Sequence, residues 1–121
     1  MHQGPPSGPL QPAQDPSVCI EQGKVIGYTN CVDGIAINNY LGIPYAQPPT
    51  GALRFAKPVP VGPSKNDINA TAYGHICWQV VDNKNYPFEE MDEDCLTINI
   101  MAPADAHLRR KKLPVLFWHH G

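Results

Sequence analysis

Short runs of β-branched and aromatic residues, separated by glycine- and asparagine-containing breaks, dominate the first third of the chain. Such runs occur at residues 18–20, 24–28 and 34–40. The intervening residues 22–23 and 30–34 have the composition of turns. The pattern predicts three short strands, and a small antiparallel sheet is the simplest arrangement for them.

Two further strands are predicted towards the C-terminal end. In residues 97–101 apolar side chains alternate around Ile98 and Ile100, whereas residues 113–118 are apolar almost throughout. An uninterrupted apolar run is typical of a strand that is buried on both faces. We therefore expect residues 113–118 to form an inner strand. No internal repeat is apparent.

Proline-rich segments lie before and between these strands. Six of the fourteen prolines fall within residues 44–63, where no long regular element can persist. We expect the side chains of Tyr45, Leu53 and Phe55 to anchor that segment. Residues 1–17 combine many prolines with few apolar side chains and are predicted to be a disordered tail. Residues 18–121 are then the folded part.

The length permits one domain of ordinary size, and the composition is that of a globular chain. The 121 residues are 42% hydrophobic and 17% charged, which is typical of a folded chain. A formal net charge of −2 gives no reason to expect a nucleic-acid or anionic-membrane partner. No apolar stretch approaches the roughly 20 residues that cross a bilayer. The first six residues lack the basic and apolar regions of a signal peptide.

Three motifs follow one another along the chain. Gly-Ile-Pro-Tyr-Ala at 42–46 precedes Leu-Arg-Phe at 53–55, Glu-Asp-Cys-Leu occupies 93–96, and the apolar run 113–118 leads into His120 and Gly121. In this order they resemble the N-terminal part of the type-B carboxylesterase/lipase family, which includes the cholinesterases. The resemblance implies the opening portion of an α/β-hydrolase fold, with a small antiparallel hairpin sheet, proline-rich loops and the first strands of the central sheet.

The resemblance also implies an activity. Family members hydrolyse carboxylic esters, small-molecule or lipid, through an acyl-serine intermediate and without a cofactor. His120 and Gly121 match the start of the oxyanion-hole loop, whose following backbone N–H groups stabilise the negative oxygen. The family usually has an apolar residue where His119 stands.

No residue of this chain is assigned a catalytic role. Ser17 and Ser64 lack the Gly-x-Ser-x-Gly context of the nucleophile, so the chain by itself is expected to be inactive. The family also contains adhesion proteins that have lost the serine, and a protein-binding role is therefore the alternative function. The presence or replacement of that serine distinguishes ester hydrolysis from the protein-binding role. No oligomeric state is predicted.

The four cysteines, at 19, 31, 77 and 95, allow three pairings. The resemblance implies a Cys77–Cys95 disulfide that closes a surface loop, and parity then makes a Cys19–Cys31 bond possible. Four reduced cysteines in a cytosolic protein are the alternative. A metal site is not expected, because the chain has no Cys-x₂-Cys or His-x₃-His spacing.

An ion pair, a glycosylation sequon and two charged runs are further features of the sequence. The resemblance implies a buried ion pair between Arg54 and Glu93, with two parallel hydrogen bonds, and two solvated charges are the alternative. The cysteines and the family resemblance indicate a secreted or extracellular protein, and an Asn-Ala-Thr glycosylation sequon that begins at Asn69 adds slight support. The carboxylates within 89–94 and the cations at 109–112 are interpreted as solvated, and Trp78 as a packing residue.

Overall fold

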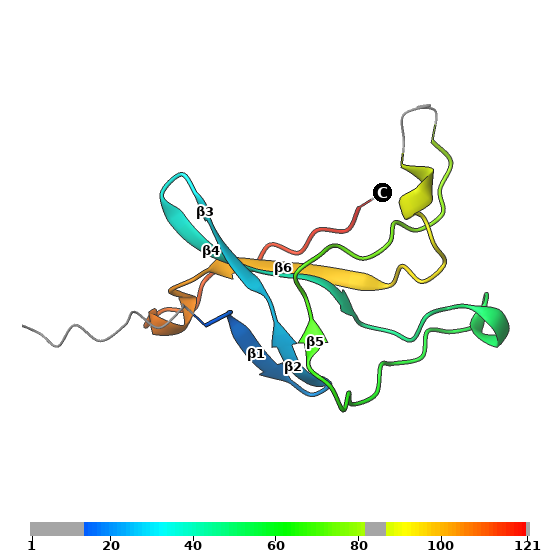
Figure 1. The fold of residues 1–121 in the computed structure, drawn as a ribbon, viewed down its shortest axis with the longest axis horizontal. Helices are drawn as coiled ribbons and strands as arrows, with labels where there is room; N and C mark the ends of the chain where they lie inside the picture. Colours follow the sequence, from blue (N-terminus) through cyan, green and yellow to red (C-terminus); the bar gives the residue numbers. More distant parts are fainter. Residues whose placement is uncertain (1–13, 82–86, 121) are drawn as a thin grey trace, which may run out of the picture.

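The computed structural model describes residues 14–81 and 87–120. In these residues six strands form two three-stranded sheets, shown in Figure 1. The first sheet has the order β1 (Ser17–Ile20), β2 (Gly23–Ile26), β5 (Ile68–Asn69), and the second has the order β3 (Tyr28–Val32), β4 (Ile35–Pro44), β6 (Thr97–Pro103). The helices of the described residues are three short 3₁₀ turns: η1 (Gly51–Leu53), η2 (Phe88–Glu90) and η3 (Ala106–Leu108).

The first sheet is built on a tight hairpin. β1 and β2 are antiparallel, with Ile20 opposite Gly23, and β5 joins the other edge of β2 in parallel. The N–H of Gly27 donates to Pro16 O over 2.9 Å, which extends the ladder to the residue before β1. Ordered structure thus begins before the predicted tail ends, and residues 1–13 of that tail lie outside the described residues.

The second sheet contains a second hairpin. β3 and β4 are antiparallel, and the turn between them consists of Asp33 and Gly34, whose φ values are 49° and 80°. Positive φ at both central residues is the requirement of a type I′ turn, which matches the twist of the flanking strands. The predicted strand 24–28 is divided at Gly27 between β2 and β3, so the single predicted sheet is two sheets.

β4 is the longest of the described strands, and its pairing is irregular within its length. β6 pairs with it on the edge opposite β3, and the register shifts between Tyr40 and Ile43. Gly42 lies in this bulge with φ +66°, and its N–H donates to Asn99 Oδ1 over 2.8 Å. The strand predicted at 97–101 is therefore confirmed as β6, although it continues to Pro103.

The hydrophobic core lies where β2 and β5 meet β4. Its buried side chains are Val25, Tyr40, Ile43 and Ala70, and Ile68 and Ile98 pack against them. The N–H of Leu41 donates to Ala70 O over 2.8 Å, so β4 is also hydrogen-bonded to the segment after β5. Asn39 is buried but donates to Asn30 Oδ1 over 2.8 Å, which satisfies a polar group that burial would otherwise destabilise.

The prediction of an inner strand at residues 113–118 is wrong. The segment is irregular, and Val115 and Leu116 are 88% and 90% exposed. A strand needs a neighbour that pairs with its backbone N–H and C=O groups. Within the described residues, the strands of both sheets pair with one another and none pairs with residues 113–118. An apolar pattern without a pairing partner therefore does not form a strand here.

The predicted anchors of the proline-rich segment are also wrong in two of three cases. Tyr45 is exposed and Phe55 is 97% exposed, whereas Leu53 is half-buried. The segment is held instead by backbone pairing, because the N–H of Gln47 donates to Val59 O over 2.7 Å. The small side chain of Ala46 is buried beside this pairing.

Candidate functional site

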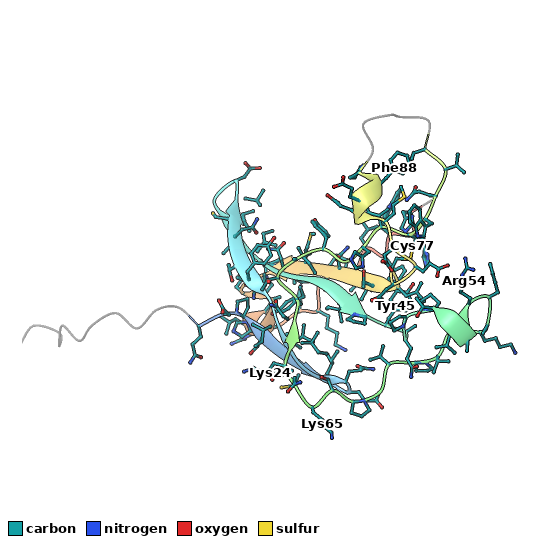
Figure 2. The ribbon with its side chains drawn as sticks, turned by 45° about the vertical axis from the view of Figure 1, so that its right-hand side comes forward. Lys24, Tyr45, Arg54, Lys65, Cys77 and Phe88 are labelled. Carbon is teal, nitrogen blue, oxygen red and sulfur yellow. A yellow bond between two sulfur atoms is a disulfide. The ribbon has the colours of Figure 1, made fainter. Side chains whose placement is uncertain are left out.

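A disulfide-closed loop is the most organised feature outside the sheets. Cys77 and Cys95 are joined, with their Cα atoms 5.1 Å apart, as the resemblance implied. Figure 2 shows the loop that carries Cys77 and Phe88 projecting away from the hairpin that carries Lys24. Residues 82–86 of the loop lie outside the described residues.

Backbone hydrogen bonds hold the two limbs of this loop together. The N–H of Ile76 donates to Glu90 O over 2.9 Å, and the N–H of Asp92 donates to Ile76 O over 3.0 Å. Met91 lies between these bonds and is buried. The loop is therefore fixed by a short ladder and a core side chain as well as by the disulfide.

The carboxylates near the loop base are exposed or serve local turns. Asp92 Oδ1 accepts from the N–H of Asp94 over 2.8 Å, and His75 Nδ1 lies 3.2 Å from Asp94 O. Within residues 14–81 and 87–120 there is no group of three or more His, Cys, Asp or Glu side chains that could hold a metal ion. The interpretation of the carboxylates within 89–94 as solvated agrees with the exposure of Glu89, Glu90, Asp92 and Asp94, whereas Glu93 is half-buried.

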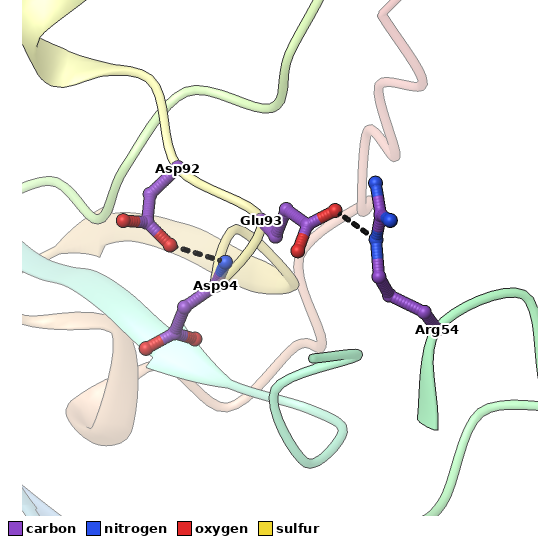
Figure 3. A network of polar contacts seen from close by, with 4 residues as sticks. All are labelled: Arg54, Asp92, Glu93 and Asp94. Atoms are coloured by element: carbon purple, nitrogen blue, oxygen red, sulfur yellow. Dashed lines mark hydrogen bonds and ion pairs between the residues drawn. The ribbon is translucent and has the colours of Figure 1, made fainter. Parts of the chain in front are cut away.

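An ion pair connects this base to the proline-rich segment. Arg54 Nε donates to Glu93 Oε1, as Figure 3 shows. The guanidinium carbon of Arg54 lies 5.1 Å from the ring centroid of Phe55. The side chains of Arg54 and Glu93 are 55% and 36% exposed, so the expectation of a buried pair is wrong. No other described segment covers it enough to exclude water.

The possible Cys19–Cys31 disulfide is absent, because both residues are free and exposed. Cys19 lies on β1 opposite Lys24, whereas Cys31 lies on β3 opposite Ala36. The division of the chain at Gly27 places the two thiols in different sheets, so parity of the cysteine count does not lead to a bond here.

The sequon lies on β5 with its acceptor residue exposed. Asn69 Oδ1 accepts from Thr71 Oγ1 over 2.7 Å and from the N–H of Thr71 over 3.2 Å. Both bonds engage the side-chain oxygen and not the nitrogen that carries a glycan. Ala70, between them, is fully buried and fixes the position of the sequon on the sheet.

The C-terminal segment is exposed along its described length. The rings of Phe117 and His119 lie with centroids 5.0 Å apart. His120 is exposed and Gly121 lies outside the described residues, so their assignment to the oxyanion-hole loop stays a prediction. Ser17 pairs with Ile26 in the first sheet, and Ser64 Oγ donates to Asn66 O over 2.7 Å in a turn.

Two hollows were not visible in the sequence. An apolar cavity of about 300 Å³ lies between the two sheets, and a more polar cleft of about 550 Å³ lies beneath the disulfide loop. Their linings come from segments far apart along the chain, so no local motif marks them. The cavity is lined mainly by Val18, Ile20, Val25, Tyr40, Ile43 and Ile98, and the cleft by Tyr73, His75, Glu89, Glu90, Asp94 and Thr97.

Two of the minor interpretations can be compared with the structure. Trp78 is 61% exposed, so its interpretation as a packing residue is wrong for the described residues. Residues 109–112 are exposed and irregular, in agreement with a solvated turn. Among the described helices, none is long and apolar enough to span a membrane.

Comparison with known proteins relates the sequence to one family. Residues 14–121 match the sequence model of the Carboxylesterase family. The chain is 39% identical over 124 residues to liver carboxylesterase of Sus scrofa, covering 92% of this chain and 22% of the relative. It is 40% identical over 110 residues to carboxylesterase 5A of Felis catus, covering 84% and 19%. The chain thus spans about a fifth of the length of the curated relatives it matches. It belongs to the carboxylesterase family.

Proposed function

We propose that the protein containing this chain hydrolyses carboxylic esters by way of an acyl-serine intermediate and without a cofactor. The observation that carries the proposal is the family match over residues 14–121. Small-molecule or lipid esters are the substrate class. Because Ser17 and Ser64 lack the nucleophile context, the catalytic residues would be supplied by a part of the protein outside these 121 residues.

The role of this chain is then to support the active site. His120 and Gly121 would begin the loop whose backbone N–H groups bind the oxyanion. The apolar segment 113–118 would position that loop. The disulfide loop and the Arg54–Glu93 ion pair would hold the neighbouring irregular segments in place, which is consistent with their positions in the structure.

A secreted or extracellular location is part of the proposal. The Cys77–Cys95 disulfide supports it, because such bonds form and persist in oxidising compartments. The exposed acceptor Asn69 gives further support, since N-glycosylation occurs in the secretory route.

The test uses the full-length product of the gene, after its transcript has been sequenced past the codon for Gly121. We expect a Gly-x-Ser-x-Gly motif, covalent labelling by a fluorophosphonate probe, and hydrolysis of p-nitrophenyl butyrate. Both activities should be lost when the motif serine is replaced by alanine. A folded full-length protein that shows neither activity would contradict the proposal and favour the protein-binding alternative. The 121-residue chain alone is the inactive control.

A further inference from the structure

Residues 109–112 are four consecutive cations in a segment with little backbone hydrogen bonding. All four side chains are exposed, and no regular structure follows η3 within the described residues. The N–H of Arg109 donates to Ala106 O over 3.3 Å, and between residues 110 and 119 the described backbone makes no further backbone–backbone hydrogen bond. An endopeptidase binds its substrate as an extended chain, so this segment can be bound without local unfolding.

The charges in this run are available for recognition. Arg109 pairs with Asp105 over 3.0 Å, whereas Arg110, Lys111 and Lys112 make no ion pair within residues 14–81 and 87–120. Four of the nine cationic side chains of the chain are concentrated here. A serine endopeptidase with an aspartate in its primary specificity pocket binds one such side chain.

We propose that residues 109–112 are a site of limited proteolysis by serine endopeptidases specific for basic residues. The peptide bond after Arg110, Lys111 or Lys112 is hydrolysed, and water supplies the hydroxyl of the new carboxyl group and the proton of the new amine. This proposal goes beyond ester hydrolysis and does not depend on it.

The other basic residues of the chain are in less favourable positions. Lys24 lies within the β1–β2 ladder, and Arg54 is ion-paired with Glu93. Lys57 precedes Pro58, whose ring prevents the substrate geometry that these enzymes need at the bond. Beside Lys65, the N–H of Ser64 donates to Gln22 O over 2.6 Å, so that segment is attached to the first hairpin. The structure therefore favours the 109–112 run over these sites.

Cleavage would separate two parts of the protein. All four cysteines precede Arg109, so the Cys77–Cys95 disulfide does not bridge the cut. The two sheets would be divided from segment 113–118 and from His120. Loss of the covalent connection between the sheets and that segment is the expected structural effect.

The experiment is limited proteolysis of the folded full-length protein with a low concentration of trypsin, followed by intact-mass measurement and N-terminal sequencing. Lys84, which lies outside the described residues, is replaced by glutamine in every sample. Within residues 14–121 the first cut is expected after Arg110, Lys111 or Lys112. The variant with glutamine at all four positions of the run should release the N-terminal part at least about tenfold more slowly, because the remaining sites need local opening.

Controls separate this result from general unfolding. The Lys65→Gln variant should release the same first fragment at the same rate as the parent protein. Circular dichroism must show that the parent and both variants have the same fold before trypsin is added. A first cut after Lys24, Arg54 or Lys65 in the folded protein, or no cut at residues 109–112, would overturn the proposal.

Discussion

Arg54 and Glu93, which are 39 positions apart, form an ion pair between the segment after η1 and the base of the disulfide loop. Both groups are accessible to water, and exposed pairs of this kind stabilise a fold by about 0–1 kcal/mol. The pair therefore adds little to the stability of the fold and mainly fixes the positions of the two segments relative to each other. It connects two irregular segments that no strand joins.

The Glu93→Gln variant tests the exposure of this pair. In the full-length protein it should lower the free energy of unfolding by at most about 1 kcal/mol, with a smaller difference in 1 M salt, because counterions screen exposed charges. Urea denaturation at low and high salt measures both values. Glu90→Gln, whose side chain has no described ion-pair partner, is the matched control. A loss of several kcal/mol would mean that the rest of the protein buries the pair.

Removal of the disulfide should have a larger effect. The Cys77→Ser, Cys95→Ser double variant is expected to lose about 3 kcal/mol of stability. The bond joins residues 18 positions apart, and closing a loop of that length lowers the conformational entropy of the unfolded chain. Thermal unfolding of the full-length protein measures the loss. The Cys19→Ser, Cys31→Ser double variant should unfold at the parent temperature, because both thiols are free and exposed. Equal losses in the two variants would contradict the assignment.

Glycosylation of Asn69 can be tested in cells with a secretory pathway. The parent protein should carry an N-linked glycan at this position, and Thr71→Ala should remove it, because the hydroxyl of the sequon is lost. Peptide mass spectrometry before and after glycosidase treatment detects the change. Thr71→Ser retains a hydroxyl and should retain the glycan. An unmodified Asn69 in a secreted, folded parent protein would contradict the prediction.

Gly27 should not tolerate a side chain. A Cβ atom there would lie 2.1 Å from Asn39 O and 2.7 Å from Tyr40 Cδ1, so β4 would have to move. We expect Gly27→Ala to destabilise the full-length protein by about 1–3 kcal/mol or more, as overpacked sites do. Gly62→Ala, which adds a methyl group in open space, should change stability little. Similar urea unfolding midpoints for the Gly27→Ala and Gly62→Ala variants would contradict the close approach of Gly27 to β4.

A strand could be predicted where a run of β-prone residues has a pairing strand close to it in the sequence. The hairpin β1–β2 satisfies that condition, because it closes within a few residues. The prediction of a turn over residues 30–34 is wrong for residues 30–32, which belong to β3, and only Asp33 and Gly34 form the turn before β4. Residues 113–118 have the pattern without a partner among the described strands, and this is why the prediction failed there. The break at Gly27 was missed because a glycine inside a β-prone run is compatible with both a continuous and a divided strand.

The site was predictable only where a motif specifies a pairing. The Cys77–Cys95 bond and the Arg54–Glu93 contact could be expected from the family motifs, although the exposure of the ion pair could not. Burial depends on which segments cover a residue, and a local pattern does not contain that information. The cavity between the sheets and the cleft beneath the loop were missed for the same reason.

The position of β4 between β3 and β6 has a consequence for the order of folding. The β3–β4 hairpin needs only the two-residue turn between Val32 and Ile35, whereas pairing of Pro44 with Thr97 must close a long loop. Loop closure over many residues is slow, and local hairpins form within microseconds. During synthesis on a ribosome, the hairpin therefore forms first, and one edge of β4 stays unpaired until β6 has been translated. Chaperone binding to the nascent chain is expected in that interval.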